Sequence, residues 1–296
     1  MNSEEIEKWK KAGRLARDAL HFGKTLIENE KKMLDVTEKI ESYVRKNGGE
    51  LAFPTNLALN NVGAHWTPSS KSKDVFRKGD VVKLDVGVHI DGYIGDNALT
   101  VEIETKNYEK MIEASREALN AAINVAVAGV NVGFIGHAVQ DKIEQYGYRP
   151  IANLTGHRIK RYNLHSGISI PSVRERGGPS LTNGDIIAIE PFVTDGAGRV
   201  GGKRNSNIYH LRQIRKIRDE KATELMIEIQ DRYKGLPFAE RWLHEIQEDA
   251  TKNLQKLMRA GIVSYYPVLD ELGKGIVSQS EHTLLITNNG NEVLTG

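Results

Sequence analysis

Apolar and charged residues recur at helical spacing through residues 3–29 and 34–47, and two glycines follow the second stretch. The same spacing returns over residues 108–128 and 133–146, again with a glycine at the end. Apolar residues three and four positions apart share one face of a helix, and glycine commonly follows a helix C-terminus. We therefore expect four helices, arranged along the chain in two consecutive pairs.

Between these pairs, residues 81–101 show the pattern of a β-hairpin. Asp91-Gly92 is a strong signal for a two-residue turn, and this turn sets the register of the two strands. In that register Asp85 and Asp96 lie on one face, diagonal to each other and about 7 to 8 Å apart. The hairpin therefore predicts two carboxylates that can converge on one point.

The other face of the hairpin is apolar and is predicted to be the core face. It carries Val82, Leu84, Val86, Val88, Ile90, Tyr93, Leu99 and Val101. Antiparallel sheets commonly bury one face and leave the other in water. From the hairpin alone, the simpler interpretation is that Asp85 and Asp96 face solvent.

A later strand, predicted at 185–193, repeats the first strand of the hairpin. "GDIIAIEPFV" lines up with "GDVVKLDVGV" 105 residues earlier, which lays Glu190 over Asp85. Each half also carries a histidine before its strand, His65 and His165, and "VTEKIESYVRKNGG" resembles "IGHAVQDKIEQYGY". The pattern indicates an internal duplication packed about a pseudo-twofold axis, with the site at the join. For the upstream match, the alternative is that any two helix-strand segments look alike once gaps are allowed, whereas the match between the Gly-Asp strands is harder to dismiss.

Glu190 has apolar neighbours on both sides in the sequence, and Glu281 stands directly before "HTLLIT". A buried carboxylate costs several kcal/mol unless it is paired, protonated or bound to a cation. Cationic side chains are scarce beside these acids, and Lys83 is the nearest in sequence. A bound metal ion is therefore the better partner.

Carboxylates and histidine suit Mn, Fe, Co or Zn, and bridging carboxylates can hold two ions about 3.5 to 4 Å apart. Two-metal hydrolases activate one water between such ions. The candidate ligands are Asp85, Asp96, His157, Glu190 and Glu281.

Composition narrows the chemistry further. The chain has 296 residues, enough for one large domain or two ordinary ones, and contains no cysteine. Disulfides, thiolate catalysis and Cys-ligated zinc are therefore excluded. A formal charge of +2 is too balanced to indicate a nucleic-acid or membrane partner. With no apolar signal-peptide core and no run of about 18 apolar residues, a cytosolic location is expected.

Residues 203–259 break the repeat, with 13 Lys or Arg against 9 Asp or Glu. Within them, residues 212–233 are predicted to form one amphipathic helix with a basic start. A basic helix can contact RNA, although a solvated helix face is the commoner meaning. Strand-like sequence returns at 275–287, so we interpret the segment as an insertion.

The motifs "AHWTP", "LDVGVHIDGYIGD", "NLTGH", "LHSG", "IEPF" and "SEHT" follow in this order along almost the whole chain. Together they resemble the type 2 methionine aminopeptidases of peptidase family M24, especially the short archaeal forms. The resemblance implies an α+β pita-bread fold with internal duplication. It further implies a catalytic domain at 1–202 plus 263–296 and a helical insertion subdomain at 203–262. The long charged N-terminal extension of eukaryotic type 2 enzymes is not expected.

By the same resemblance, Asp85 binds one of two divalent ions (Co, Mn, Fe or Zn), Asp96 and Glu281 bridge them, and His157 and Glu190 complete the second site. His65 and His165 match non-ligand active-site histidines that bind substrate and stabilise the oxyanion. Glu190 also carries the proton to the leaving amine, and Phe53 matches a position lining the methionine pocket, although core packing explains an aromatic residue there nearly as well.

The implied reaction is removal of the initiator methionine from nascent proteins when the second residue is small. A monomer is expected, with possible ribosome contact and no membrane partner. Trp66 stands where a tyrosine is more usual, and Ser280 where an aromatic residue is common; both positions flank the expected site and leave the metal ligands intact. Rival interpretations are a proline dipeptidase or aminopeptidase P, which usually carries a separate N-terminal domain, and a non-catalytic relative that binds RNA.

Overall fold

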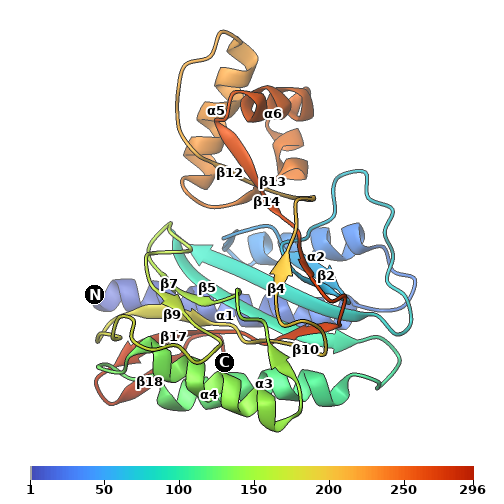
Figure 1. The fold of residues 1–296 in the computed structure, drawn as a ribbon. Helices are drawn as coiled ribbons and strands as arrows, with labels where there is room; N and C mark the ends of the chain where they lie inside the picture. The colour runs from blue at the N-terminus through green and yellow to red at the C-terminus, as the bar shows by residue number, and fades with distance from the viewer. Residues whose placement is uncertain (1) are drawn as a thin grey trace.

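The computed structural model describes residues 2–296 and contains the four expected helices (Figure 1). They are α1 (Ser3–Leu26), α2 (Met33–Lys46), α3 (Glu109–Val125) and α4 (Val132–Gln145). After α2 and α4 the chain turns at Gly48 and Gly147, which have φ of 77° and 82°. Such left-handed residues end helices, and glycine adopts this conformation without strain. The two pairs therefore end in the same way.

The predicted hairpin forms from β4 (Val81–Ile90) and β5 (Tyr93–Glu102). Asp91 and Gly92 have φ of 51° and 85°, as the expected turn requires. The register is the predicted one, with Ile90 opposite Tyr93 and Asp85 opposite Ala98. Strand β4 also pairs with β1 (Glu50–Leu51) and β2 (Asn56–Leu59), so it lies inside the first sheet.

The second half builds a sheet in the order β18-β17-β9-β7-β8. Its strands are β7 (Gly156–Ile159), β8 (Ser169–Ile170), β9 (Ile186–Ile189), β17 (His282–Thr287) and β18 (Gly290–Val293). The single strand expected at 185–193 is two strands, because β9 ends before Glu190 and β10 (Phe192–Thr194) follows. Pro191 has no N–H for a ladder, which explains the break.

Strand β10 belongs to a separate three-stranded sheet with β6 (Arg149–Pro150) and β16 (Val277–Gln279). The strand-like stretch at 275–287 is therefore also divided, into β16 and β17, with Glu281 between them. A further small sheet joins β3 (Val62–Ala64), β11 (Val200–Gly201) and β15 (Leu269–Glu271).

The duplication extends to individual hydrogen bonds. Before β4, Asp80 accepts the Arg77 N–H at 2.8 Å, and before β9, Asp185 accepts the Thr182 N–H at 2.8 Å. Each aspartate also accepts, through its backbone carbonyl, an N–H from the partner strand, from Ile103 and from Ile286 respectively. An aspartate therefore makes the same hydrogen bonds before the corresponding strand in each half.

The two halves join where β5 meets the start of β17. Ala98 and Glu281 form an isolated antiparallel bridge. On one side of it, the Thr283 hydroxyl donates to the Asp96 carbonyl and accepts the Asp96 N–H, both at 2.8 Å. On the other side, Thr100 makes the same pair of bonds to Gln279, at 2.7 and 2.8 Å. Two buried threonines thus fasten the seam symmetrically.

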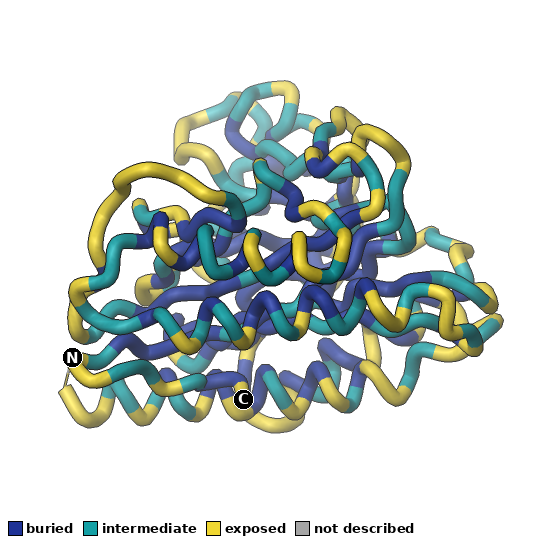
Figure 2. The backbone as a smooth tube through the Cα atoms, turned by 60° about the horizontal axis from the view of Figure 1, so that its bottom comes forward, coloured by how far each residue is buried: buried dark blue, intermediate teal, exposed yellow. Residues whose placement is uncertain are grey.

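Helices cover the outer faces of the strands (Figure 1). Helices α3 and α4 run along the bottom of the view, below β9 and β17, while α1 packs on β4 and β5. Figure 2 shows buried backbone concentrated in the strands between these layers, with exposed positions on the outer helix faces and loops. The predicted core face of the hairpin is buried against α1 and α2.

Residues 205–267 contain a separate sheet and most of the elements at the top of Figure 1. The elements are β12 (Asn205–Leu211), α5 (Glu220–Tyr233), β13 (Phe238–Ala239), the 3₁₀ helix η1 (Glu240–Glu245), α6 (Ala250–Arg259) and β14 (Val263–Pro267). The pairing of β12 with β14 closes this segment at its base. The division at 203–262 stays a prediction.

The basic helix predicted at 212–233 is wrong in its first part, because α5 begins only at Glu220. Asp219 accepts the Ala222 N–H at 3.0 Å and so caps the helix at this point. The residues before Asp219 instead lie beside the C-terminal end of α6, where the Gln213 side chain donates to the Gly261 carbonyl at 3.2 Å. Among the described residues, no helix is long and apolar enough to cross a membrane.

Candidate metal centre and active site

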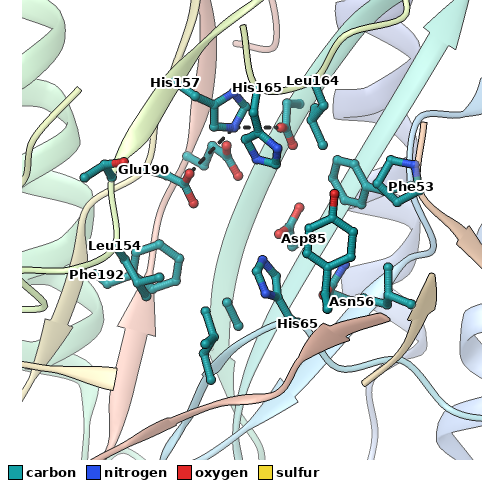
Figure 3. Close-up of a pocket in the computed structure, with 18 of the residues that line it drawn as sticks. Phe53, Asn56, His65, Asp85, Leu154, His157, Leu164, His165, Glu190 and Phe192 are labelled. Carbon is teal, nitrogen blue, oxygen red and sulfur yellow. Dashed lines mark ion pairs between the residues drawn. The ribbon is translucent and has the colours of Figure 1, made fainter. Parts of the chain in front are cut away.

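A cavity of about 300 Å³ lies between the two halves (Figure 3). Every site residue predicted from the sequence lines it: Phe53, His65, Asp85, Asp96, His157, His165, Glu190 and Glu281. Both strands of the hairpin contribute a carboxylate, and the second half contributes two more at the ends of its strands. The structure therefore brings together residues that are far apart in the sequence.

Three side chains at the centre lie close enough to share one metal ion. Asp96, His157 and Glu281 are buried, and each offers a ligand atom within 4.8 Å of the others. The His157 Nε2 atom is 3.6 Å from Asp96 Oδ2 and 3.7 Å from Glu190 Oε1, as the dashed lines in Figure 3 show. These separations are too long for hydrogen bonds and suit atoms that point at a common ligand.

Several polar atoms in the cavity have no hydrogen-bond partner within residues 2–296. They are Asp85 Oδ1, Asp96 Oδ1, His157 Nδ1, both Glu281 carboxylate oxygens and His65 Nδ1. The residues that line the cavity include no lysine or arginine in the described chain. Lys83, the nearest cation in the sequence, is fully buried but donates to the Asn60 carbonyl at 2.7 Å. Because unpartnered buried carboxylates are costly, a divalent cation fits this donor set.

The raised pKa values of the four carboxyl groups also indicate that a cation would stabilise their ionised forms. Burial raises the pKa of Asp85 to about 7, although the Gln279 side chain opposes the shift. Burial and then the Asp85 charge hold the pKa of Asp96 well above its usual range. Burial, followed by the charges of the neighbouring acids, raises the pKa of Glu190 and of Glu281 in the same way. A cation among the four would favour their ionised forms.

The histidines of the cavity are held neutral. Burial, and then the nearby His165, lower the pKa of His157 well below its usual range. Burial also lowers the pKa of His165. The two rings meet edge to face with centroids 4.4 Å apart. A neutral imidazole offers one nitrogen as an acceptor or metal ligand and one N–H as a donor, so both rings suit catalysis at neutral pH.

His65 enters the cavity from the first half and has a left-handed backbone, with φ of 58°. Burial, and then His165, lower the pKa of its ring to about 4, while the carbonyl of Pro267 opposes the shift. Its ring lies 5.3 Å from that of Tyr266, which also lines the cavity. Tyr266 was not predicted, because nothing in the sequence connects β14 with the residues around His65.

Phe53 lines the cavity and is 6 % exposed. Its ring lies directly on Gly87 of β4, where an added Cβ would come within 2.2 Å of the ring. Leu154, Leu164, Phe192 and Leu269 supply further apolar lining that the sequence did not reveal.

Neither residue that departs from the family pattern lines the cavity. Trp66 packs against the main core, and the Ser280 hydroxyl lies 2.9 Å from that of Ser115 in α3. These two departures from the family pattern therefore lie beside the cavity and not in its lining.

The pattern that defines metallopeptidase family M24 matches residues 7–288. The chain belongs to this family, and its fold and cavity are those of a metal-dependent hydrolase. A prolidase from Pyrococcus furiosus shares the fold at 21 % identity and a TM-score of 0.65, and this chain covers 64 % of it.

Full-length relatives narrow the class. The methionine aminopeptidases of Methanocaldococcus jannaschii and Archaeoglobus fulgidus are 44 % and 41 % identical to this chain, and each alignment covers all of both proteins. The solved methionine aminopeptidase of Thermotoga maritima has a TM-score of 0.73 at 26 % identity, covering 100 % of this chain and 98 % of that one. The resemblance found in the sequence is confirmed, and the chain is a metallo-aminopeptidase.

Proposed function

We propose that this cavity removes the initiator methionine from proteins and peptides with two divalent ions, preferring a small second residue. The observation that carries the proposal is the convergence of buried carboxylates and His157 on a cavity that residues 2–296 line without a lysine or arginine. The full-length methionine aminopeptidases support the same reaction. Asp85, Asp96, His157, Glu190 and Glu281 would hold the ions.

Bound divalent ions would activate a water and polarise the scissile carbonyl. The protein's own groups supply the remaining steps. Glu190 accepts a proton and passes it to the leaving amine, a role that suits a carboxyl with a raised pKa. The neutral His165 ring donates an N–H to the developing oxyanion. His65 holds the substrate backbone near the second residue, and Phe53 contacts the methionine side chain.

The test uses protein stripped with a chelator, then supplied with Co, Mn, Fe or Zn, and measures products by mass spectrometry. Met-Ala-Ser should release methionine only with metal, and Met-Leu-Ser should react more slowly. Cleavage of Leu-Pro instead would contradict the aminopeptidase and indicate a proline dipeptidase. Isothermal titration of the stripped protein should give two divalent ions per chain, and a single ion would contradict the two-metal site.

We also propose that the enzyme works as a cytoplasmic monomer on chains emerging from the ribosome. Support comes from the arm before α5: Arg212, Arg215, Lys216 and Arg218 are exposed, and no acid lies among them in residues 212–218. Anionic RNA attracts such a cluster in a salt-dependent way. Sedimentation with ribosomes should weaken after charge reversal of Arg212 and Lys216. Reversal of the exposed Lys71 and Lys73 is the matched control, and equal loss in both would contradict the contact.

A further inference from the structure

A buried ion pair joins the insertion to the catalytic half. Glu41 of α2 and Arg241 of η1 are 2 % and 8 % exposed, and the Arg241 Nη2 group donates to the Glu41 carboxylate. The Trp242 indole N–H donates to the other Glu41 oxygen at 2.7 Å. Moving two charged side chains out of water costs free energy of desolvation. We therefore expect the buried Glu41–Arg241 pair to serve a role at this position.

The pair also contacts two segments that carry residues of the cavity. On one side, the Thr55 N–H donates to Glu41 at 3.2 Å, two residues after Phe53. On the other side, Arg241 Nη1 donates to the Thr67 hydroxyl at 3.1 Å and to the Pro68 carbonyl at 2.9 Å. The two segments are tied together in turn, because the Thr67 hydroxyl donates to the Thr55 carbonyl at 2.8 Å.

The segment that Arg241 contacts begins two residues after His65. The backbone of His65 is left-handed, a conformation that costs free energy in a residue with a Cβ. Such a conformation persists only where the surrounding contacts determine it. The insertion supplies two more of these contacts from β12. The Thr67 N–H donates to the Ser206 carbonyl at 3.2 Å, and the Asn207 amide donates to the Thr67 carbonyl at 2.9 Å.

We propose that Arg241 is a positioning residue for the substrate site: its guanidinium spans from Glu41 to Thr67 and Pro68 and thereby fixes the backbone that presents His65. The inference rests on the proposed role of His65 in holding the substrate. An arginine is required because its planar fork can bond to both sides at once, whereas a lysine ammonium is a single point charge.

The test is a double-mutant cycle between R241K and H65A, with KM and kcat for Met-Ala-Ser measured in the metal-loaded enzyme. R241K keeps a positive charge beside Glu41 but cannot also hold Thr67 and Pro68. It should raise KM about fivefold with kcat nearly unchanged, as expected when only substrate binding is lost. In the H65A background the same substitution should change KM by less than about twofold, because coupled residues are not additive.

Equal effects of R241K in both backgrounds, or none in either, would overturn the positioning role. If H65A itself leaves KM unchanged, the failure lies with the proposed role of His65 and not with the connection to Arg241. Should R241K fold poorly, T67V replaces it, because this change removes the hydroxyl that receives Arg241. The matched control is K256M, which breaks the 2.6 Å pair with Asp219 inside the insertion and should leave KM unchanged.

Discussion

The two halves of this molecule share a scaffold but differ at the site they build. Asp80 and Asp185 prepare corresponding strands, and Thr100 and Thr283 make corresponding bonds across the seam. Yet Thr283 bonds to the backbone of Asp96, whereas Thr100 bonds to that of Gln279. Backbone hydrogen bonds have been kept in duplicate, while the side chains between them have diverged.

The residues that stabilise the fold are therefore different from the candidate residues for the chemistry. Asp85 and Glu190 occupy equivalent positions and differ by one methylene. At the seam, Ala98, which has no reactive group, pairs with Glu281, which has a carboxylate. An asymmetric candidate metal site on a nearly symmetric frame would allow each carboxylate to have its own role.

The largest effect is expected from replacing Asp96 with Asn, which gives it the uncharged amide chemistry of its counterpart Gln279. A candidate metal ligand would be lost, so kcat/KM should fall by about 10⁴-fold, or about 5.5 kcal/mol in transition-state stabilisation. Kinetics and metal titration should both change. D91N, in the exposed turn of the same hairpin, is the control, and retained activity in D96N would rule out the ligand role.

The next effect distinguishes Glu190 from its equivalent, Asp85. Glu190→Gln should lower kcat by about 10²–10⁴-fold with little change in KM, because a proton carrier is lost. Asp85→Asn should instead weaken metal binding and recover part of its activity at high metal concentration. Measurements of kcat against metal concentration separate the two. Matching behaviour in both variants would contradict the division of tasks.

A third test concerns pH and the metal-free protein. The folded pKa of Asp85, about 7, lies above its unfolded value of about 3.9, so its folded state prefers the protonated form. Stability contributed by Asp85 is therefore present below pH 4 and lost as the pH rises to about 7.

The metal-free D85N variant should accordingly gain stability over the wild type by about 1.4 kcal/mol per pH unit across this window. Urea unfolding at several pH values, with a chelator present, measures the difference. D18N on the exposed face of α1 is the control. A pH-independent difference between D85N and wild type would contradict the assignment.

The smallest effect on activity is expected from replacing the two threonines of the seam, one at a time. Either Thr100→Val or Thr283→Val leaves a buried N–H and carbonyl without partners and should cost about 1–3 kcal/mol in the free energy of unfolding. Only the second change disturbs the backbone of Asp96, so T283V should also lower kcat/KM severalfold. Thermal unfolding and kinetics on both variants measure this. An equal loss of activity would show that the seam acts as one unit.

Local patterns in the sequence predicted much of this structure. Asp91-Gly92 fixed the register of the hairpin, and helical spacing located the four long helices within a few residues. The candidate site residues, which line one cavity, were selected because carboxylates in apolar surroundings are conspicuous and because ordered motifs resembled a known family. These signals are short in sequence and have a direct physical meaning.

What escaped prediction depends on contacts between distant segments. Glu41 and Arg241 look like ordinary charged positions in the sequence, and only the fold shows that they are buried together. Tyr266 gives no local sign that it faces His65. The start of α5 was misplaced because helical spacing continued into residues 212–218, whereas the Asp219 cap and the contacts with α6 determine the observed boundary.

The contact between Phe53 and Gly87 has a mechanical consequence. Because the ring rests on bare backbone of β4, no intervening side chain can adjust to a larger or smaller occupant. The same strand carries Asp85 two residues away, so any displacement of that wall also displaces a candidate metal ligand. On the proposal that Phe53 contacts the methionine side chain, this wall would act as a rigid gauge, and a substrate that does not fit it would be held out of line with the reacting groups.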